Sequence, residues 1–146
     1  MAADADGVAP VAGSADLAAI VFAGDFERVH YALVLATSTA AIGGRATLFF
    51  TGEAVRALAD DGWRLLPGAG GAGGGEIDER YRRSGVAGFA ELLDAAVALG
   101  VRFIVCEMGL RVVGLSREDL RADVPVELAG VVTLLADPAA RCLIFI

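Results

Sequence analysis

Five short apolar runs occur along the chain, and segments with helical spacing separate the first three of them. The runs are residues 17–23, 46–51, 101–106, 131–135 and 142–146. Near-continuous apolar runs of this length are typical of parallel strands that are buried on both faces of a sheet. Between them, residues 27–42 and 86–99 repeat apolar side chains at helical spacing. This alternation predicts an α/β fold, a three-layer α/β/α sandwich around a mostly parallel five-stranded sheet.

Shorter elements fill the remaining segments. Residues 53–60 carry apolar side chains on one helical face, and residues 77–84 form a short charged helical segment. Residues 110–113 are expected to form one helical turn. Ser116 to Asp119 has the Ser-x-x-acid spacing of a capping box, and Asp137-Pro138 is typical of a turn or the start of a short helix.

The domain organisation follows from length and glycine content. A chain of 146 residues is expected to form one domain, here residues 17–146. Residues 1–16 are rich in Ala, Gly and Asp and are expected to be a flexible tail. Residues 67–75 (PGAGGAGGG) hold six glycines in nine positions, so we expect a mobile loop there.

Composition excludes several classes of protein. A hydrophobic content of 56% with a mean hydropathy of +0.63 excludes disorder as the main state. The net charge is −7 and the 12 basic residues, all Arg, form no cluster, so nucleic acid is not an expected partner. The first basic residue is Arg28, and no run of about 18 residues stays apolar, so we expect neither an export signal nor a membrane span. A cytoplasmic protein without disulfides is predicted.

Candidate site residues lie at the predicted carboxyl ends of the strands, where open parallel sheets bind ligands. These loops are Gly24-Asp25-Phe26, Thr51-Gly52 and Cys106-Glu107-Met108-Gly109. Cys106 comes where a strand meets a loop and a possible helix N-terminus, a position that favours a reactive thiolate. The alternative is that Cys106 is simply the last buried residue of its strand.

The other residues with reactive or aromatic side chains have ordinary interpretations. Cys142 is expected in the core of the last strand, and His30 on a helix surface, with a catalytic role for His30 left open. Phe26 and Trp63 are expected to pack in a core or an interface. One His and no clustered thiols predict no metal site, and no phosphate-loop pattern predicts a nucleotide or flavin, so no cofactor is expected.

The segment Gly100-Val-Arg-Phe-Ile-Val-Cys106-Glu-Met-Gly-Leu-Arg-Val-Val-Gly-Leu115 resembles the DsrE/DsrF-like family, in the sulfur-relay subgroup with a Cys-Glu-Met stretch followed by Gly. The first predicted strand, helix and strand, and the last two strands, resemble those of the family as well. Three positions depart from the pattern: Gly109 stands where Ser is usual, Arg111 where an acidic or polar residue is common, and Val113 where Met is usual.

The resemblance implies a sulfur carrier or sulfurtransferase that holds sulfane sulfur on Cys106 as a persulfide. It also implies sulfur donor and acceptor proteins as partners, and a homo-oligomer. Around Cys106, the candidate binding residues are Glu107, Met108, Arg111, Gly24, Asp25 and Thr51. Glu107 is equally suited to capping a turn, and Arg111 either holds an anionic sulfur species or is an ordinary exposed helical residue. The alternative function is a non-catalytic oligomeric binding or scaffold protein of the same fold.

Overall fold

The strands form one parallel sheet. The structure is a computed structural model and describes residues 15–146. The order of the strands is β4-β3-β2-β1-β5, and every neighbouring pair is parallel. Their bounds are β1 Leu17–Val21, β2 Ala46–Phe50, β3 Arg102–Cys106, β4 Val126–Ala129 and β5 Leu143–Phe145. The sequence did not determine this order, in which the last strand joins the edge beside β1.

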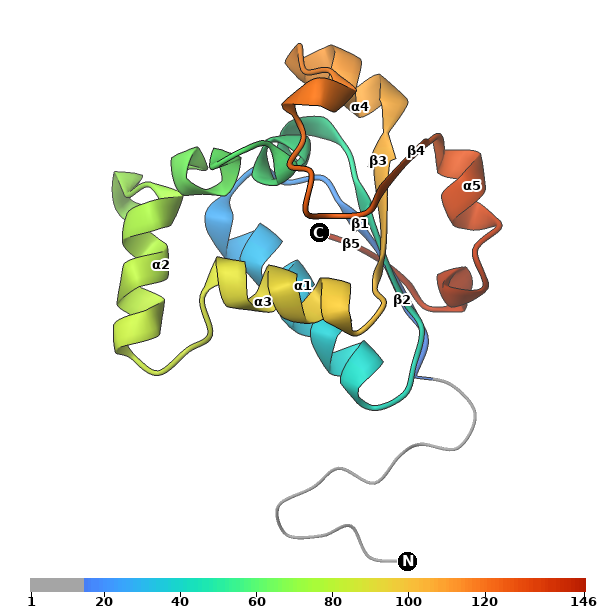
Figure 1. Cartoon of the computed structure of the whole chain (residues 1–146), viewed down its shortest axis with the longest axis horizontal. Coiled ribbons are helices and arrows are strands. Elements are labelled where there is room, and N and C mark those ends of the chain that lie inside the picture. The colour runs from blue at the N-terminus through green and yellow to red at the C-terminus, as the bar shows by residue number, and fades with distance from the viewer. Residues whose placement is uncertain (1–14) are drawn as a thin grey trace, which may run out of the picture.

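Helices cover both faces of the sheet, which confirms the predicted α/β/α sandwich. Figure 1 shows α1, α2 and α3 on one side and α5 on the other, with α4 beyond the end of β3. The α-helices are α1 Phe26–Ala41, α2 Gly74–Arg83, α3 Phe89–Ala98, α4 Glu107–Val113 and α5 Val131–Leu135. Five 3-10 segments join them, η1 Gly52–Leu58, η2 Gly62–Leu65, η3 Ala69–Gly71, η4 Arg117–Asp119 and η5 Pro138–Arg141.

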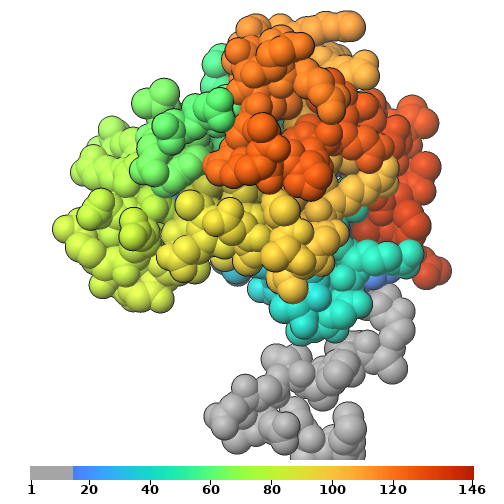
Figure 2. Space-filling model, in the orientation of Figure 1, coloured from blue at the N-terminus to red at the C-terminus, as the bar shows by residue number. Residues whose placement is uncertain are grey.

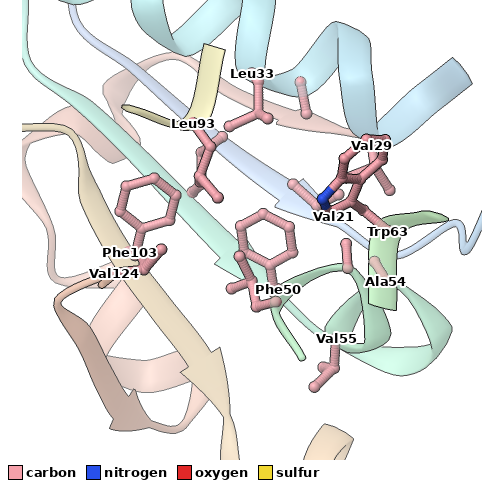
Figure 3. Packing of buried hydrophobic residues seen from close by; sticks show 14 of the residues in the cluster. Val21, Val29, Leu33, Phe50, Ala54, Val55, Trp63, Leu93, Phe103 and Val124 are labelled. Carbon is pink, nitrogen blue, oxygen red and sulfur yellow. The ribbon is translucent and has the colours of Figure 1, made fainter. Parts of the chain in front are cut away.

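The main core lies between the sheet and the layer of α1 and α3. Phe50 and Phe103 point from β2 and β3 towards Leu33 of α1 and Leu93 of α3 (Figure 3). The two phenyl rings lie 6.3 Å apart and nearly parallel. Trp63 extends this core towards η2. Alternation along the strands sends every second side chain into this layer, which is why short, fully apolar strands suit the central positions.

The opposite face of the sheet has a smaller core. Its buried members are Ala18, Phe49, Ile104, Cys106, Leu134 and Ala139. Leu134 is the fully buried residue of α5, a helix of five residues, and Ala139 belongs to η5. This face therefore has a much thinner cover than the face that packs against α1 and α3.

The prediction of a strand over residues 131–135 is wrong, because these residues form α5. The fourth strand is Val126–Ala129, directly after Pro125. An apolar run of five residues fits either a strand or a buried helical turn, and periodicity cannot separate the two. The edge position of β4 also allows the charged Glu127, so its sequence lacks the continuous apolar pattern of the central strands.

Two segments between β2 and α3 also differ from their predicted form. The predicted helix over 53–60 is the 3-10 segment η1, and α2 begins at Gly74, inside the glycine-rich run. A Cβ atom on Gly74 would overlap the carbonyl oxygen of Trp63, so this glycine permits close packing at the start of the helix. The mobility of residues 67–75 remains a prediction.

The segment that follows α4 pairs with the end of η1, on one side of the carboxyl ends of the strands. Leu120 forms a bridge with Ala59, and the backbone N–H of Arg121 donates to the carbonyl of Leu58 at 2.9 Å. Figure 2 shows this orange segment against the green η1–η2 region. The predicted capping box is present, with Asp119 accepting from the Ser116 backbone at 2.8 Å.

Most of the predicted N-terminal tail, residues 1–14, lies outside the described residues. At its end, Asp16 accepts hydrogen bonds from the backbone and side chain of Arg45. Within residues 15–146, no helix is both long enough and apolar enough to cross a bilayer.

Candidate functional site

Cys106 is the last residue of β3 and the residue that precedes α4. Its backbone is extended (φ −67°, ψ 123°), and the first helical residue is Glu107. The predicted junction of a strand with a helix N-terminus is therefore present, without an intervening loop. The register Cys106↔Ala129 places the cysteine beside the end of the edge strand β4.

The Cys106 side chain points to the α5 face of the sheet and is buried. It is 5% exposed and shares its apolar surroundings with Phe49, Ile104 and Leu134. Leu134, the fully buried residue of the five-residue α5, belongs to the same cluster, so the thiol and α5 lie on the same side of the sheet.

Three of the predicted binding residues share a hollow beside α4. Gly24, Thr51 and Met108 line a space of about 300 Å³ together with Phe22 and other neighbours. Met108 is 67% exposed, and its lining partners come from the carboxyl ends of β1 and β2. Cys106 is not among the residues that line this hollow.

Gly109 explains how closely α4 approaches the end of β2. A Cβ atom there would lie 3.1 Å from the Cα of Thr51 and from the backbone nitrogen of Gly52. A serine, which the family pattern favours, would be tighter than most real contacts at this position. Glycine here lets α4 sit directly against the loop that follows β2.

The remaining predicted binding residues lie outside the hollow. Glu107 and Arg111 are exposed on α4, one turn apart. Asp25 caps α1, accepting from the backbone N–H of Arg28 at 3.2 Å and from its guanidinium at 3.0 Å. Together with Gly24, Asp25 also lines a second and larger pocket.

A buried polar network on the α5 face was missed in the sequence. Asp137 accepts hydrogen bonds from Thr47 at 2.8 Å, from Arg102 at 2.7 Å and from the backbone N–H of Ala139 at 2.7 Å. Arg102 also forms a bidentate pair with Glu127. Burial raises the pKa of Asp137, but these hydrogen bonds outweigh it and hold the pKa below the ordinary value of 3.8. The sequence signal was Asp137-Pro138, which indicates a turn but not its partners.

Cys142 is exposed, so its predicted core position is wrong. It precedes β5, and the register Ala18↔Leu143 puts it at the start of the sheet's strands, whereas Cys106 ends β3. Strand rise and spacing separate the two cysteines by about 20 Å. A disulfide requires Cα atoms within about 7 Å, so these residues cannot pair within one chain.

His30 is buried, so its predicted surface position is also wrong. It lies 4% exposed beneath Tyr81, and its Nε2 donates to the carbonyl oxygen of Ala87 at 2.9 Å. Phe26 and Trp63 belong to the same buried aromatic group, as predicted for core residues. The helix spacing of α1 could not reveal that α2 and α3 cover this side of it.

Within residues 15–146, no group of three or more His, Cys, Asp or Glu side chains could hold a metal ion. The sequence could not show that Cys106 lies outside the lining of the hollow beside α4.

Comparisons with known proteins agree with this architecture. The DsrE/DsrF-like family model matches residues 16–137. No curated protein matches the sequence significantly. Among solved structures, the chain is similar to MTH1491, a protein of unknown function from Methanobacterium thermoautotrophicum. The TM-score is 0.52 at 16% identity, over 90% of this chain and 100% of that one. The structural likeness supports the fold, and the family match, which covers all four strands from β1 to β4 and the Cys106 segment, supports the lineage. The chain belongs to the DsrE/DsrF-like family.

Proposed function

We propose that this protein is a sulfur carrier in which Cys106 accepts sulfane sulfur as a persulfide and passes it to a partner protein. The observation that carries this proposal is the position of Cys106 at the carboxyl end of β3, directly before α4, in a chain of the DsrE/DsrF-like family. Ligands of open parallel sheets gather at this edge.

The transfer needs no outside oxidant or reductant. The Cys106 thiolate attacks the outer sulfur of a donor persulfide, a new S–S bond forms, and the donor leaves as its thiolate. In the second step, an acceptor thiolate attacks the outer sulfur of the Cys106 persulfide. That sulfur moves to the acceptor, and Cys106 returns as a thiolate.

Burial of the thiol requires a movement of its cover during both steps. Cys106 is 5% exposed and belongs to the same buried cluster as Leu134 of α5. Because α5 has five residues and exposes Val131, Val132 and Leu135, its displacement uncovers the thiol at a modest cost in buried area. A donor or acceptor protein that docks on α5 is the natural trigger for this movement.

The test is to incubate the full-length protein with glutathione persulfide and to measure intact mass, followed by peptide mapping. The proposal predicts a gain of one sulfur atom on Cys106, lost in Cys106→Ser. Cys142→Ser is the matched control, because Cys142 is exposed and would react without any specific site. A sulfur adduct confined to Cys142 would exclude the carrier function.

The second candidate function is an oligomeric binding or scaffold protein in which Cys106 serves packing. The observation that favours it is the near-complete burial of the thiol in an apolar cluster. Under this function, Cys106→Ser retains every partner interaction of the protein. The mass measurement above separates the two functions, because the scaffold protein acquires no sulfur on Cys106.

We also propose that the chain works as a homo-oligomer in the cytoplasm, through the thinly covered face. Apolar side chains are exposed along β1, β5 and α5: Phe22, Leu143, Phe145, Val131, Val132 and Leu135. The Phe22 and Phe145 rings lie 5.5 Å apart in a tilted arrangement, and β5 is an edge strand without charged residues. Together these side chains expose on the order of 600 Å², close to the roughly 800 Å² that one partner gives a standard interface. Light scattering should show an oligomer at micromolar concentration, and a monomer would contradict it.

A further inference from the structure

A pocket apart from Cys106 lies between the β1–α1 loop and the η1–η2 region. Its volume is about 730 Å³, within the range of small-molecule sites in proteins. Ala23, Ala59, Leu66 and Leu115 supply much of its apolar lining. Apolar walls with a few charged groups at the mouth are typical of sites that enclose an organic molecule.

The walls of the pocket are held by close backbone contacts. A Cβ atom on Gly24 would lie 2.5 Å from the Cβ of Glu53, and one on Gly62 would overlap the carbonyl oxygen of Arg56. The backbone N–H of Phe26 donates to the carbonyl of Pro67 at 2.9 Å, which ties the third wall to α1. The space is therefore preformed by the packing of these segments.

The charged side chains at the mouth of the pocket determine which charge on a ligand would be favoured there. Arg28 pairs with Asp25 at 3.0 Å, and Arg56 pairs with Glu53 at 2.5 Å, so both guanidinium groups already have carboxylate partners. Asp60 also lines the pocket and forms no ion pair within residues 15–146, since Arg121, a guanidinium whose charge Asp60 feels, pairs with Asp123 at 2.8 Å. Three carboxylates against two guanidinium groups leave a local charge of −1, in a chain whose net charge is −7.

We propose that this pocket binds a small amphipathic amine, with its apolar body against the leucine and alanine side chains and its ammonium group at Asp60. An anionic ligand would have to displace a carboxylate from Arg28 or Arg56 and would then face the remaining acidic groups. A neutral ligand would gain the apolar contacts alone. The site is independent of sulfur transfer, because Cys106 is not part of its lining.

The experiment compares three probes with the same apolar body: phenylbutylamine, phenylbutanol and phenylbutyrate. Each is titrated into the full-length protein and followed by calorimetry and by backbone amide shifts. The amine should bind most tightly, about fivefold more tightly than the alcohol, as one exposed charge pair allows. The amide shifts should centre on Ala23, Ala59 and Leu66. Equal binding of the three probes, tightest binding of phenylbutyrate, or shifts centred on α5 would overturn the proposal.

Two matched variants sharpen the result. Asp60→Asn should reduce amine binding about fivefold and leave alcohol binding unchanged, whereas Asp61→Asn, next to it but outside the pocket lining, should change neither. Ala59→Phe should weaken all three probes by filling the pocket, and loss of the Asp60→Asn effect alone would already contradict the proposal. Cys106→Ser should bind the amine normally, so this site and the sulfur carrier proposal fail separately.

Discussion

The two faces of the sheet differ in the size of the core that they bury. The face towards α1 and α3 buries large aromatic and aliphatic side chains, among them Phe50, Phe103 and Leu93. The face towards α5 buries a smaller group that contains Cys106, with the Asp137 network beside it. The thick face buries most of the core, whereas the thin face holds the thiol that we propose to carry sulfur. Under this proposal, stability and reactivity depend on different layers of the same sheet.

The largest expected effect is a cavity in the thick face. Phe103→Ala should lower the free energy of unfolding by about 3–5 kcal/mol, because the phenyl ring is fully enclosed between β3 and the helices. Phe49→Ala is the matched variant on the thin face, where the short cover can collapse into the space, and its cost should lie at the lower end of that range. Urea denaturation measures both. A larger loss from Phe49→Ala than from Phe103→Ala would contradict the comparison.

The next effect concerns the polar network on the thin face. Asp137→Ala should destabilise the protein by about 2–3 kcal/mol, because it leaves Thr47 and the Ala139 N–H without their acceptor and removes one partner of Arg102. Asp137→Asn keeps one oxygen as a hydrogen-bond acceptor and should lower the free energy of unfolding by less than Asp137→Ala. Chemical denaturation at neutral pH gives both values.

The pH dependence of the same network has a definite sign. The pKa of Asp137 is lower in the folded protein than the ordinary 3.8, so the folded state favours the ionised carboxylate. Its contribution to stability is fully present above about pH 3.8 and decreases as the pH falls towards the folded pKa. Wild type should therefore lose more stability than Asp137→Asn as the pH is lowered below about 3.8. Parallel curves would show that Asp137 does not contribute this dependence.

A further prediction concerns the access of reagents to the thiol. Leu134→Ala in a Cys142→Ser background should cost about 2 kcal/mol and raise the rate of Cys106 labelling by Ellman's reagent about tenfold, because local opening of α5 becomes easier. Leu93→Ala, in the other layer, is the control for a general loss of stability. If both variants label equally fast, global unfolding rather than α5 controls access.

The smallest expected effect is at Gly109, where α4 contacts the loop that follows β2. Gly109→Ser should cost about 1 kcal/mol, since its Cβ would lie 3.1 Å from Thr51 and Gly52 and shift α4 slightly. Thermal denaturation measures the change. The control is Glu107→Ala, which changes the same helix at an exposed position and should be nearly neutral. Gly114→Ala is unsuitable as a control, because Gly114 has a positive φ of 72°.

The sequence predicted the parts of the fold that depend on local pattern. β1, β2, β3 and β5 are apolar runs, and α1 and α3 have strong helical spacing, so each appears within a few residues of its predicted bounds. β4 was missed because an edge strand with Glu127 does not need a continuous apolar pattern, and Val131–Leu135 was taken for it. The order of the strands depends on contacts far apart in the chain, which no local pattern contains.

The candidate site was predictable in its location but not in its accessibility. Gly24, Thr51 and Met108 lie close together because the carboxyl ends of parallel strands meet at one edge of the sheet. The buried cluster around Cys106 includes Leu134, 28 positions further along, in a segment that the apolar pattern predicts as a strand. The predicted positions of His30 and Cys142 are wrong for the same reason, because exposure depends on elements that are distant in the sequence. Such elements cover α1 and bury His30, whereas none covers Cys142 at the start of β5.

The most direct test of the central claim is to follow sulfur through Cys106 in one sample of the Cys142→Ser protein. After incubation with glutathione persulfide and removal of the donor, an acceptor thiol is added, and the intact mass and acceptor persulfide are measured together. The account predicts one added sulfur on Cys106, followed by its loss as an equal amount appears on the acceptor. A protein that gains no sulfur on Cys106, or whose Cys106→Ser variant delivers as much sulfur, would contradict it.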